Sequence, residues 1–402
     1  MSIADLPDAD APEVVLAHPS EQERTTYRLS TAAEWAGRLN VEQYLERERT
    51  VENRPLGKDF LTGWILTNKH LPPNKRPIYA TCETFTLPAW VAYKGTCKDV
   101  VAYGVGSVYC DKKYRGKGYA TKMISELNKA LKLEQKGSLL KEPCAFSILW
   151  SDIGKQFYNR LGWAPYTSSH YALNPISPDD YVQLLHGVTG YDVAAVEELT
   201  RSDIEKKVCS ETALAKTKQL LVSASKRASN AQVSIQPAYS VFDYHFVREE
   251  FTSGHLITEQ QKPAGAHFSF PTARGASVKV SDTITVSIVW SLTLYADPKE
   301  DTLYILHIQH DQPSTPEEEA GVVKGIAACL IRAQMEAKQW NTHAVKLWNA
   351  TPIVEKAIAM IDPTSQIVHR EKDHIASLQW YGQEGMSEEK PEWWMAERFS
   401  WC

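Results

Sequence analysis

The stretch YRGKGYA, residues Tyr114 to Ala120, separates an apolar strand-like run from an apolar helix-like run, and it decides how the rest of the chain is interpreted. Its two glycines let backbone N–H groups approach a ligand closely, and a helix N-terminus adds a partial positive charge. Arg115 and Lys117 contribute two cations. These features predict an anion site, with phosphate as the usual ligand. The heptapeptide alone leaves open a tight strand-to-helix turn with solvated cations.

Before this loop, β-rich runs punctuated by Pro and Gly follow one another in the pattern of an antiparallel meander: FLTGWILTN, PIYATCETFTL, AWVAYK and DVVAYGVGSVYC. A first strand at EVVLAHP and helical patterns between Ser20 and Val51 precede them. After the loop, apolar residues recur at helical spacing as far as Leu131. We therefore expect the order β-α-α-β-β-β-loop-α-β-α.

The last strand and helix of this unit are predicted from CAFSILW and SDIGKQFYNRLGW. Gly162 would end the helix. Ile153, Phe157 and Leu161 would form its core stripe, and Tyr158 would point about 100° away from Phe157, toward the loop and the strand ends.

Composition limits the class of protein. The 402 residues are 43% hydrophobic and 23% charged, which is typical of an ordinary soluble protein with two domains. A net charge of −5 argues against a nucleic-acid partner bound by bulk electrostatics. Seven scattered cysteines suggest free thiols in a reducing compartment. We find no apolar leader and no membrane-length run, so we expect a cytoplasmic protein without a membrane partner.

The second half repeats the order of the first. Two long strand-like runs lead to a helix whose start is marked by Thr315, Pro316 and Glu318, and AVKLW and a further helix follow. SILWS at 147–151 and VKLWN at 345–349 occupy matching places. Acidic DQPSTPEEEA stands where the first half has its glycine loop, so phosphate would be repelled there. A degenerate duplication is favoured over chance similarity of two buried strands.

The chain resembles the GCN5-related N-acetyltransferases in two motifs. RGKGYA resembles the family signature R/Q-x-x-G-x-G/A, and FYNRLGW, about forty residues later, resembles F-Y-x-x-x-G-F/W. The resemblance covers residues 13–172. More narrowly, CETF, SDIGKQFYNRLGW and the overall length are similar to the fungal lysine N6-acetyltransferase group.

The resemblance implies an α/β (α+β) fold of the GNAT type with a central mixed, twisted sheet. We expect a loose N-terminus (1–12), a catalytic domain that binds acetyl-CoA (13–175) and a helical connector (176–230). A degenerate GNAT-like domain (231–402) would lack the phosphate loop and form a wall of the acceptor pocket.

The same resemblance assigns roles to residues. The pyrophosphate would be held by the loop: Arg115, Gly116, Lys117, Gly118, Tyr119 and Ala120. The pantetheine arm would lie along Val108, Tyr109 and Cys110, and a backbone N–H near Val108 or Cys110 would polarise the acetyl carbonyl. Ser151 stands where the family often has an Asn that contacts the coenzyme.

Tyr158 corresponds to the tyrosine that protonates the leaving thiolate in many family members, and its ordinary pKa of about 10 suits a thiol of about 8.5. Packing alone is the competing interpretation. Direct attack by the amine is favoured over an acetyl-cysteine on Cys110. His307 and His310 lie on opposite faces of one predicted strand, so no metal site is expected.

The amine must also lose a proton, which for lysine costs about 4–5 kcal/mol at pH 7. Glu83, inside a β-rich run, is the candidate to receive it; exposed on the wet face of the sheet it would have no role. The aromatic cluster EWWMAERFSW would line the acceptor pocket or, as we favour, pack in the core of the second domain.

The sequence therefore predicts an acetyl-CoA-dependent N-acetyltransferase with free L-lysine as the first-choice acceptor, in lysine degradation. Other small amines and protein lysines fit the same residues. A non-enzymatic acyl-CoA-binding regulatory module is the contrasting hypothesis, and an intact Tyr158 beside an intact loop favours the enzyme. The oligomeric state stays open.

Overall fold

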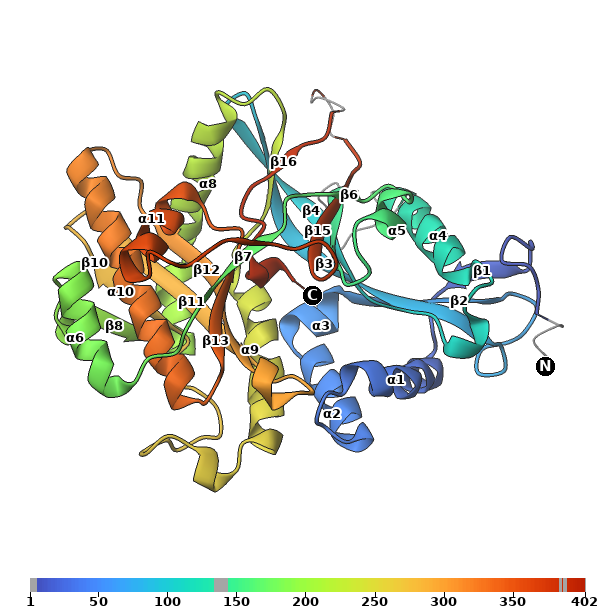
Figure 1. The fold of residues 1–402 in the computed structure, drawn as a ribbon. Coiled ribbons are helices and arrows are strands. Elements are labelled where there is room, and N and C mark those ends of the chain that lie inside the picture. The colour runs from blue at the N-terminus through green and yellow to red at the C-terminus, as the bar shows by residue number, and fades with distance from the viewer. Residues whose placement is uncertain (1–5, 134–143, 383–384, 386–388, 402) are drawn as a thin grey trace.

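The computed structural model describes residues 6–133, 144–382, 385 and 389–401, and its strands form two mixed sheets (Figure 1). The first sheet has the order β1-β2-β3-β4-β5-β15-β6, with β9 paired to β3 and β16 paired to β9. Its strands are β1 Val14–Ala17, β2 Leu61–Asn68, β3 Ile78–Tyr93, β4 Thr96–Tyr109, β5 Cys144–Ser151, β6 Ala164–Pro165, β9 Gln232–Ile235, β15 Ile375–Trp380 and β16 Glu392–Trp393.

The second sheet has the order β14-β7-β13-β12-β11-β10-β8. Its strands are β7 Ser169–Leu173, β8 Val196–Leu199, β10 Gly275–Lys279, β11 Thr285–Thr293, β12 Thr302–His310, β13 Ala344–Trp348 and β14 Val368–His369. The first of the two long runs predicted in this half is thus a hairpin of β10 and β11, broken at the polar SDTI turn.

The α-helices are α1 Glu21–Trp35, α2 Val41–Glu52, α3 Pro55–Phe60, α4 Tyr119–Leu133, α5 Gln156–Asn159, α6 Pro178–Thr189, α7 Arg201–Asp203, α8 Glu211–Ser225, α9 Tyr239–Leu256, α10 Pro316–Gln339 and α11 Pro352–Ile361. Short helical turns include η2 Lys112–Tyr114 and η8 Arg398–Ser400. The predicted start of α10 is confirmed, because the Thr315 side chain accepts a hydrogen bond from the Glu318 N–H. Within the described part of the chain, none of the helices has the length and apolarity to cross a bilayer.

The two sheets share one topology, as predicted. In the first, β2, β3 and β4 are antiparallel, helix α4 follows, and β5 runs parallel to β4. In the second, β10, β11 and β12 are antiparallel, helix α10 follows, and β13 runs parallel to β12. The duplicated order of elements is the reason why two buried strands of similar sequence occupy matching places.

The two halves also exchange strands. β7, from the first half, pairs with β13 of the second sheet, and β15, from the second half, pairs with β5 of the first sheet. β9 adds to the first sheet beside β3, and β8, inside the predicted connector, belongs to the second sheet. The boundaries predicted near residues 175 and 230 therefore divide the sequence but not the sheets, because each sheet contains strands from both sides of a predicted boundary.

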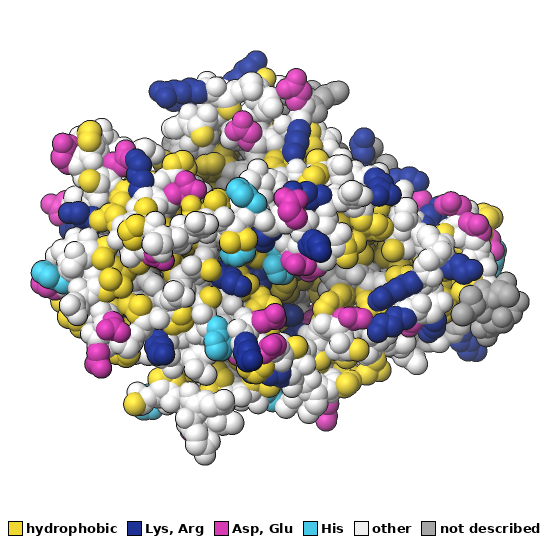
Figure 2. Space-filling view, viewed as in Figure 1, with side chains coloured by type: hydrophobic (Ala, Val, Ile, Leu, Met, Phe, Trp, Pro, Cys, Tyr) yellow, Lys and Arg dark blue, Asp and Glu magenta, His cyan; other side chains and the backbone are white. Residues whose placement is uncertain are grey.

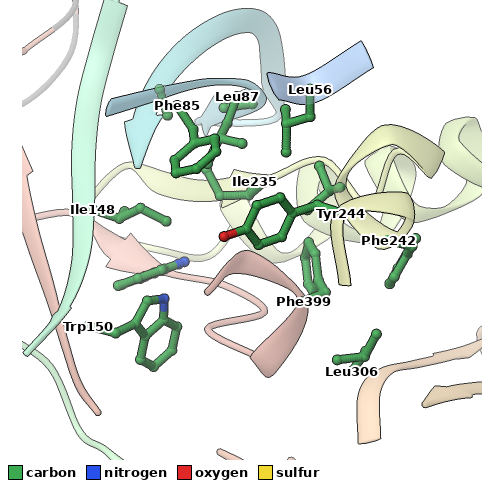
Figure 3. Close-up of a cluster of buried hydrophobic side chains, with 14 of the residues drawn as sticks. Leu56, Phe85, Leu87, Ile148, Trp150, Ile235, Phe242, Tyr244, Leu306 and Phe399 are labelled. Atoms are coloured by element: carbon green, nitrogen blue, oxygen red, sulfur yellow. The ribbon is translucent and has the colours of Figure 1, made fainter. Parts of the chain in front are cut away.

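The hydrophobic core joins the sheets (Figure 3). Phe85 of β3 and Tyr244 of α9 meet edge to face, with ring centroids 5.3 Å apart. Trp150 of β5 lies 4.8 Å from Trp348 of β13. Large apolar side chains from both sheets are therefore removed from water in one cluster, and this burial fixes the two halves against each other.

Candidate active site

Strand β4 changes its pairing partway along. It pairs with β5 from Val101 to Gly104, opposite Cys144 to Ile148, and beyond Gly104 this parallel ladder stops although both strands continue. Against β3, Glu83 faces Gly106 and Thr81 faces Tyr109, so β4 carries one extra residue. A bulge of this kind re-aims the backbone groups around it.

The bulge is accompanied by an unusual backbone conformation. Ser107 has a φ of +53°, a left-handed value that costs a residue other than glycine free energy. The neighbouring N–H groups, up to Cys110, lie on the part of β4 that has left β5. The strand therefore presents unpaired backbone to a slot between itself and β5, as expected for a strand that receives an extended ligand.

A cavity of about 590 Å³ opens at this slot. It is bordered by β3, β4 and β5, by helices α1 and α2, by α9 and by the C-terminal Trp401. Of the predicted site residues, those that line it are Glu83, Val108, Tyr109, Cys110, Arg115, Ala120 and Tyr158. In Figure 2, side chains of both charges surround a hollow in the middle of the molecule.

The glycine loop has the backbone geometry that its sequence predicts. Gly116 and Gly118 have φ values of +76° and +82°, and α4 begins at the next residue, Tyr119. A Cβ atom on Gly116 would meet no atom within 4 Å, so the requirement for glycine there comes from the backbone angle. Arg115 is half-exposed, and its Nε donates to the Cys110 carbonyl at 2.9 Å.

Two residues that were predicted to contact the coenzyme have side chains that are buried in the protein and do not line the cavity. The Tyr119 ring is buried, stacks on Tyr79 at 4.5 Å, and its hydroxyl donates to the Pro7 carbonyl at 2.6 Å. The Ser151 hydroxyl is buried and donates to the Gly154 carbonyl at 2.7 Å. Neither side chain lines the cavity, and neither do Gly116, Lys117 and Gly118, so contacts from these positions to a coenzyme stay predictions.

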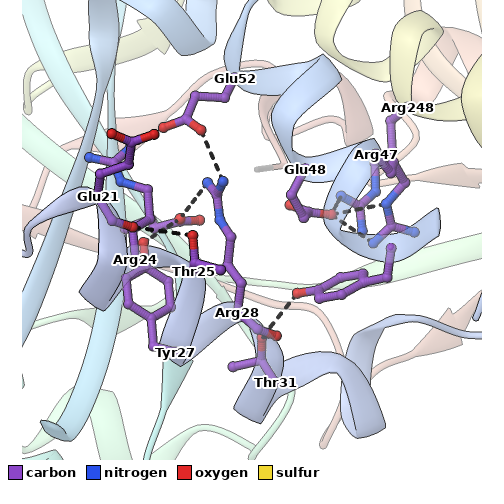
Figure 4. A network of polar contacts seen from close by, with 12 residues as sticks. Glu21, Arg24, Thr25, Tyr27, Arg28, Thr31, Arg47, Glu48, Glu52 and Arg248 are labelled. Carbon is purple, nitrogen blue, oxygen red and sulfur yellow. Dashed lines mark hydrogen bonds and ion pairs between the residues drawn. The ribbon is translucent and has the colours of Figure 1, made fainter. Parts of the chain in front are cut away.

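Glu83 is buried and does not lie on a wet face of the sheet. Its Oε1 accepts a hydrogen bond from the Tyr27 hydroxyl at 2.9 Å and pairs with Arg28 Nη2 at 3.3 Å. Arg28 also pairs with Glu52 at 2.9 Å, and Glu52 with Arg24 (Figure 4). Helix α1 thus delivers a hydroxyl and a guanidinium to the carboxylate, which keeps a buried charge compensated.

Tyr158 lines the cavity from α5, the short helix that follows β5. It is 7% exposed, and burial raises the pKa of its hydroxyl well above the usual range. The hydroxyl is therefore protonated at neutral pH and available as a donor. Its role as general acid stays a prediction.

The helix predicted around Tyr158 is wrong in length. α5 covers four residues, and Ile153, expected in the core stripe, is 63% exposed. Gly154 has a φ of +78°, which interrupts the helix, and its N–H bonds to the Lys372 carbonyl of the second half. Phe157 and Leu161 do pack partly against the core, as predicted.

Cys110 gives no sign of an activated nucleophile. Burial raises the pKa of its thiol, and Sγ lies 3.4 Å from the Tyr79 carbonyl. A raised pKa lowers the thiolate fraction at neutral pH, which favours direct attack by the amine. Among the described residues, no group of three His, Cys, Asp or Glu side chains is placed to hold a metal ion.

Several cavity residues were not predicted from the sequence: Tyr27, Arg28, Trp35, Tyr44, Tyr244 and Arg248. The polar and aromatic face of EQERTTYRLSTAAEW was a usable signal for α1. Arg248 and Trp401 could not be linked to β4 by any local pattern. Of the C-terminal aromatics, Trp393 packs in the core that the two sheets share and Trp401 lines the cavity, whose role as an acceptor pocket stays a prediction.

A family model and two curated relatives match parts of the chain. Residues 177–402 match the family model described as the LYC1 GNAT-like C-terminal domain. A protein of Yarrowia lipolytica named lysine acetyltransferase is 30% identical over 151 residues, which is 34% of this chain and 37% of that protein. The uncharacterized protein YGR111W of Saccharomyces cerevisiae is 28% identical over 184 residues, 40% of this chain and 45% of that protein. The matched region thus spans less than half the length of either relative.

Solved structures align along most of the chain at low identity. A probable N-acyltransferase of Enterococcus faecalis V583 is 11% identical with a TM-score of 0.49, covering 92% of this chain and 73% of that one. Saccharomyces cerevisiae N-myristoyltransferase with bound myristoyl-CoA is 12% identical with a TM-score of 0.48, covering 94% and 81%. Since the matching family model extends over more than half of the 402 residues, the chain belongs to the family that carries the LYC1 GNAT-like C-terminal domain.

Proposed function

We propose that the protein is an acetyl-CoA-dependent N-acetyltransferase whose first-choice acceptor is the ε-amine of free L-lysine. One observation carries the proposal: the bulged end of β4, separated from β5, opens beside the glycine loop onto a cavity lined by Tyr158 and Glu83. Membership of the family and the name of the Yarrowia lipolytica relative support amine acetylation.

The coenzyme would bind along the separated part of β4. Backbone N–H groups from Arg115 to Ala120 would hold the pyrophosphate, since both glycines already have the backbone angles that such a loop needs. The pantetheine arm would pair with the unpaired edge between Gly106 and Cys110. An N–H near the bulge would then donate to the acetyl carbonyl and stabilise negative charge on its oxygen.

The transfer follows from the positions of the side chains. The neutral amine nitrogen attacks the acetyl carbon, the C–S bond breaks, and the Tyr158 hydroxyl gives its proton to the leaving thiolate. The proton lost by the amine passes to Glu83, directly or through the Tyr27 hydroxyl that is hydrogen-bonded to it. The raised thiol pKa of Cys110 argues against an acetyl-cysteine intermediate.

We further propose that the C-terminal part forms a wall of the acceptor pocket. Tyr244 and Arg248 of α9 and the C-terminal Trp401 line the cavity opposite helix α1, which supports this role. The setting that we propose is lysine degradation in a fungal cytoplasm, and the yeast origin of the two relatives supports the fungal part of it.

A thiol-release assay with acetyl-CoA and a panel of amines tests the proposal. We expect release with L-lysine and less with polyamines and with lysine inside a peptide. Binding of acetyl-CoA without release by any amine would contradict an enzyme and favour a non-enzymatic acyl-CoA-binding module.

A further inference from the structure

A second, smaller cavity continues the first. It measures about 300 Å³ and shares Glu34, Trp35, Arg248 and Trp401 with the cavity at the slot. The wall of this cavity that lies away from the slot is formed by the second half of the chain and includes residues of β11 and of the turn η8. An acceptor that reaches the slot from this side therefore passes Arg248 and Trp401.

Arg398 lines this smaller cavity and forms no ion pair with any residue that the structure describes. It is 3% exposed, and its guanidinium lies 4.0 Å from the ring centre of Trp401, 4.5 Å from that of Trp348 and 4.6 Å from that of Tyr304.

The Nη1 of Arg398 finds no hydrogen-bond partner, and among the described residues no carboxylate forms an ion pair with this guanidinium, although the Asp152 carboxylate interacts with it electrostatically. The nearby Asp152 is bound to His374 at 2.9 Å. A buried cation without a partner costs free energy, and this cost points to an anionic ligand.

Arg248 brings a second guanidinium group to the same cavity. It pairs with Glu48 at 3.4 Å, but Arg47 donates to the same carboxylate oxygen at 2.8 and 2.9 Å (Figure 4). One carboxylate thus serves two guanidinium groups. Arg248 and Arg398 both face the ring of Trp401, at 6.0 and 4.0 Å. Arg47, Arg248 and Arg398 line the smaller cavity together with Glu34, Glu249 and Glu300, and Glu249 is already paired with Arg274 at 2.5 Å. Of these three arginines, Arg398 is the one that forms no ion pair among the described residues, so it is the cation that an anion would meet.

The other end of the cavities is balanced. There Glu83 and Glu52 compensate Arg28 and Arg24, and the Tyr27 hydroxyl adds a neutral donor. An acceptor with an amine at one end and a carboxylate at the other matches this distribution. A polyamine would place its second ammonium against Arg398, which forms no ion pair among the described residues.

We propose that Arg398 and Arg248 form a carboxylate subsite, so that the protein selects a free amino acid with a side-chain amine over polyamines and peptide lysine. The proposal rests on the acetyltransferase function proposed above. Arg398 presents its unpartnered Nη1 to one carboxylate oxygen, and Arg248 contributes a second charge-assisted contact. The amine of the same molecule then reaches the slot.

The test compares L-lysine with cadaverine, which is lysine without its carboxylate. We expect the wild-type kcat/KM for cadaverine to be at least about 100-fold lower than for lysine, the scale for leaving a buried charge unpaired. Arg398→Gln and Arg248→Gln lower kcat/KM for lysine by about 30-fold or more, mainly through KM. Both variants leave the value for cadaverine within about threefold, and Arg398→Lys restores part of the preference for lysine.

Arg370→Gln is the matched control. Arg370 is also buried, has unpartnered nitrogens and lies 4.3 Å from the ring of Trp348, yet it lines neither cavity. We expect its thermal stability to fall like that of Arg398→Gln while its KM for lysine stays within twofold. Equal losses for lysine in the two variants would show that Arg398 acts only through packing.

Binding of L-norleucine, which keeps the carboxylate and the α-amine of lysine and lacks the ε-amine, separates the two proposals. Isothermal titration should show weaker binding to Arg398→Gln and unchanged binding to Arg370→Gln. Such a result without any thiol release would leave the subsite standing and remove the proposed reaction. Thiol release at equal rates with lysine and cadaverine would keep the reaction and overturn the subsite.

Discussion

In each sheet, two neighbouring parallel strands pair for a few residues and then separate. We call this place the strand junction, and the segments that follow it differ between the two sheets. In the first, β4 leaves β5 after Gly104 and bulges at Ser107. In the second, β12 pairs with β13 only as far as Ile305, and it has one extra residue where Val289 faces His307 and Trp290 faces Ile305. The bulge and the separated strands are therefore properties of the duplicated scaffold and do not by themselves make a coenzyme site.

What differs is the loop that follows. The first junction leads to two glycines with positive φ and two cations, whereas the second leads to α10, with Glu317, Glu318 and Glu319 in its first turn. A cavity of about 820 Å³ lies at the second junction, and the C-terminal segment borders it through a 2.5 Å contact between His307 and Glu397. The two junctions therefore differ in the charge of the segment that follows them: the first presents glycines and cations to the predicted coenzyme, and the second presents glutamates.

The largest expected effect concerns the helix after each junction. α5 presents Tyr158 to the first cavity, whereas α11 presents Val354 and Glu355 to the second. Tyr158→Phe should lower kcat by about 10²–10⁴-fold, the scale of a general acid, and leave acetyl-CoA affinity nearly unchanged. A fall below about threefold, when chemistry limits turnover, would make Tyr158 structural.

The next effect concerns the loop. Gly118→Glu places a carboxylate beside the predicted pyrophosphate position and forces a side chain onto a φ of +82°. Repulsion of a few kcal/mol should raise the acetyl-CoA dissociation constant by about 100-fold or more in isothermal titration. Gly190→Glu, at a φ of +78° with open space around it, is the control for strain and charge. Similar losses in both variants would contradict a coenzyme loop.

The third test concerns the helices beside the two cavities. Helix α1 supplies Tyr27 to the first cavity, and helix α8 borders the second. Hydrogen bonds from Arg76 lower the pKa of Glu23, in the first turn of α1, from 4.5 to about 2. A lowered pKa stabilises the fold above pH 4.5, and this stability is lost as the pH falls toward 2. Glu23→Gln should thus lower the free energy of unfolding by about 3 kcal/mol at pH 7.

Urea unfolding at pH 7 and pH 2.5 measures this difference. The exposed Glu21→Gln, in the same turn, is the control and should change little. A penalty for Glu23→Gln that is as large at pH 2.5 as at pH 7 would contradict the assignment.

The smallest effect belongs to the second junction. Glu397→Gln removes the charge opposite His307 and should lower the free energy of unfolding by about 1–2 kcal/mol. Acetyl-CoA affinity should stay within twofold, because the contact lies away from the first slot. A tenfold change in that affinity would show that the second junction takes part in coenzyme binding.

Local patterns predicted the parts of the site that lie close together in the chain. The glycine loop, the strand before it and Tyr158 fall within about fifty residues, and hydrophobic periodicity and turn chemistry identify each of them. The helix around Tyr158 was predicted too long because Gly154 can adopt either sign of φ, and its actual value depends on a bond to Lys372.

Other features depend on pairing between distant segments. The sequence of β15 has the pattern of an ordinary strand, but its partner β5 lies more than 220 residues earlier. No local sequence pattern could therefore predict that β7 and β15 are exchanged between the two sheets. The same holds for Arg248 and Arg398, which reach the cavities only because α9 and η8 pack against the first sheet.

Hydrogen–deuterium exchange of the full chain with and without acetyl-CoA tests the central contrast most directly. The account predicts protection of residues 105–120, along β4 and the glycine loop, and unchanged exchange in residues 305–320 at the second junction. Protection of the second junction, or none in the first, would contradict it.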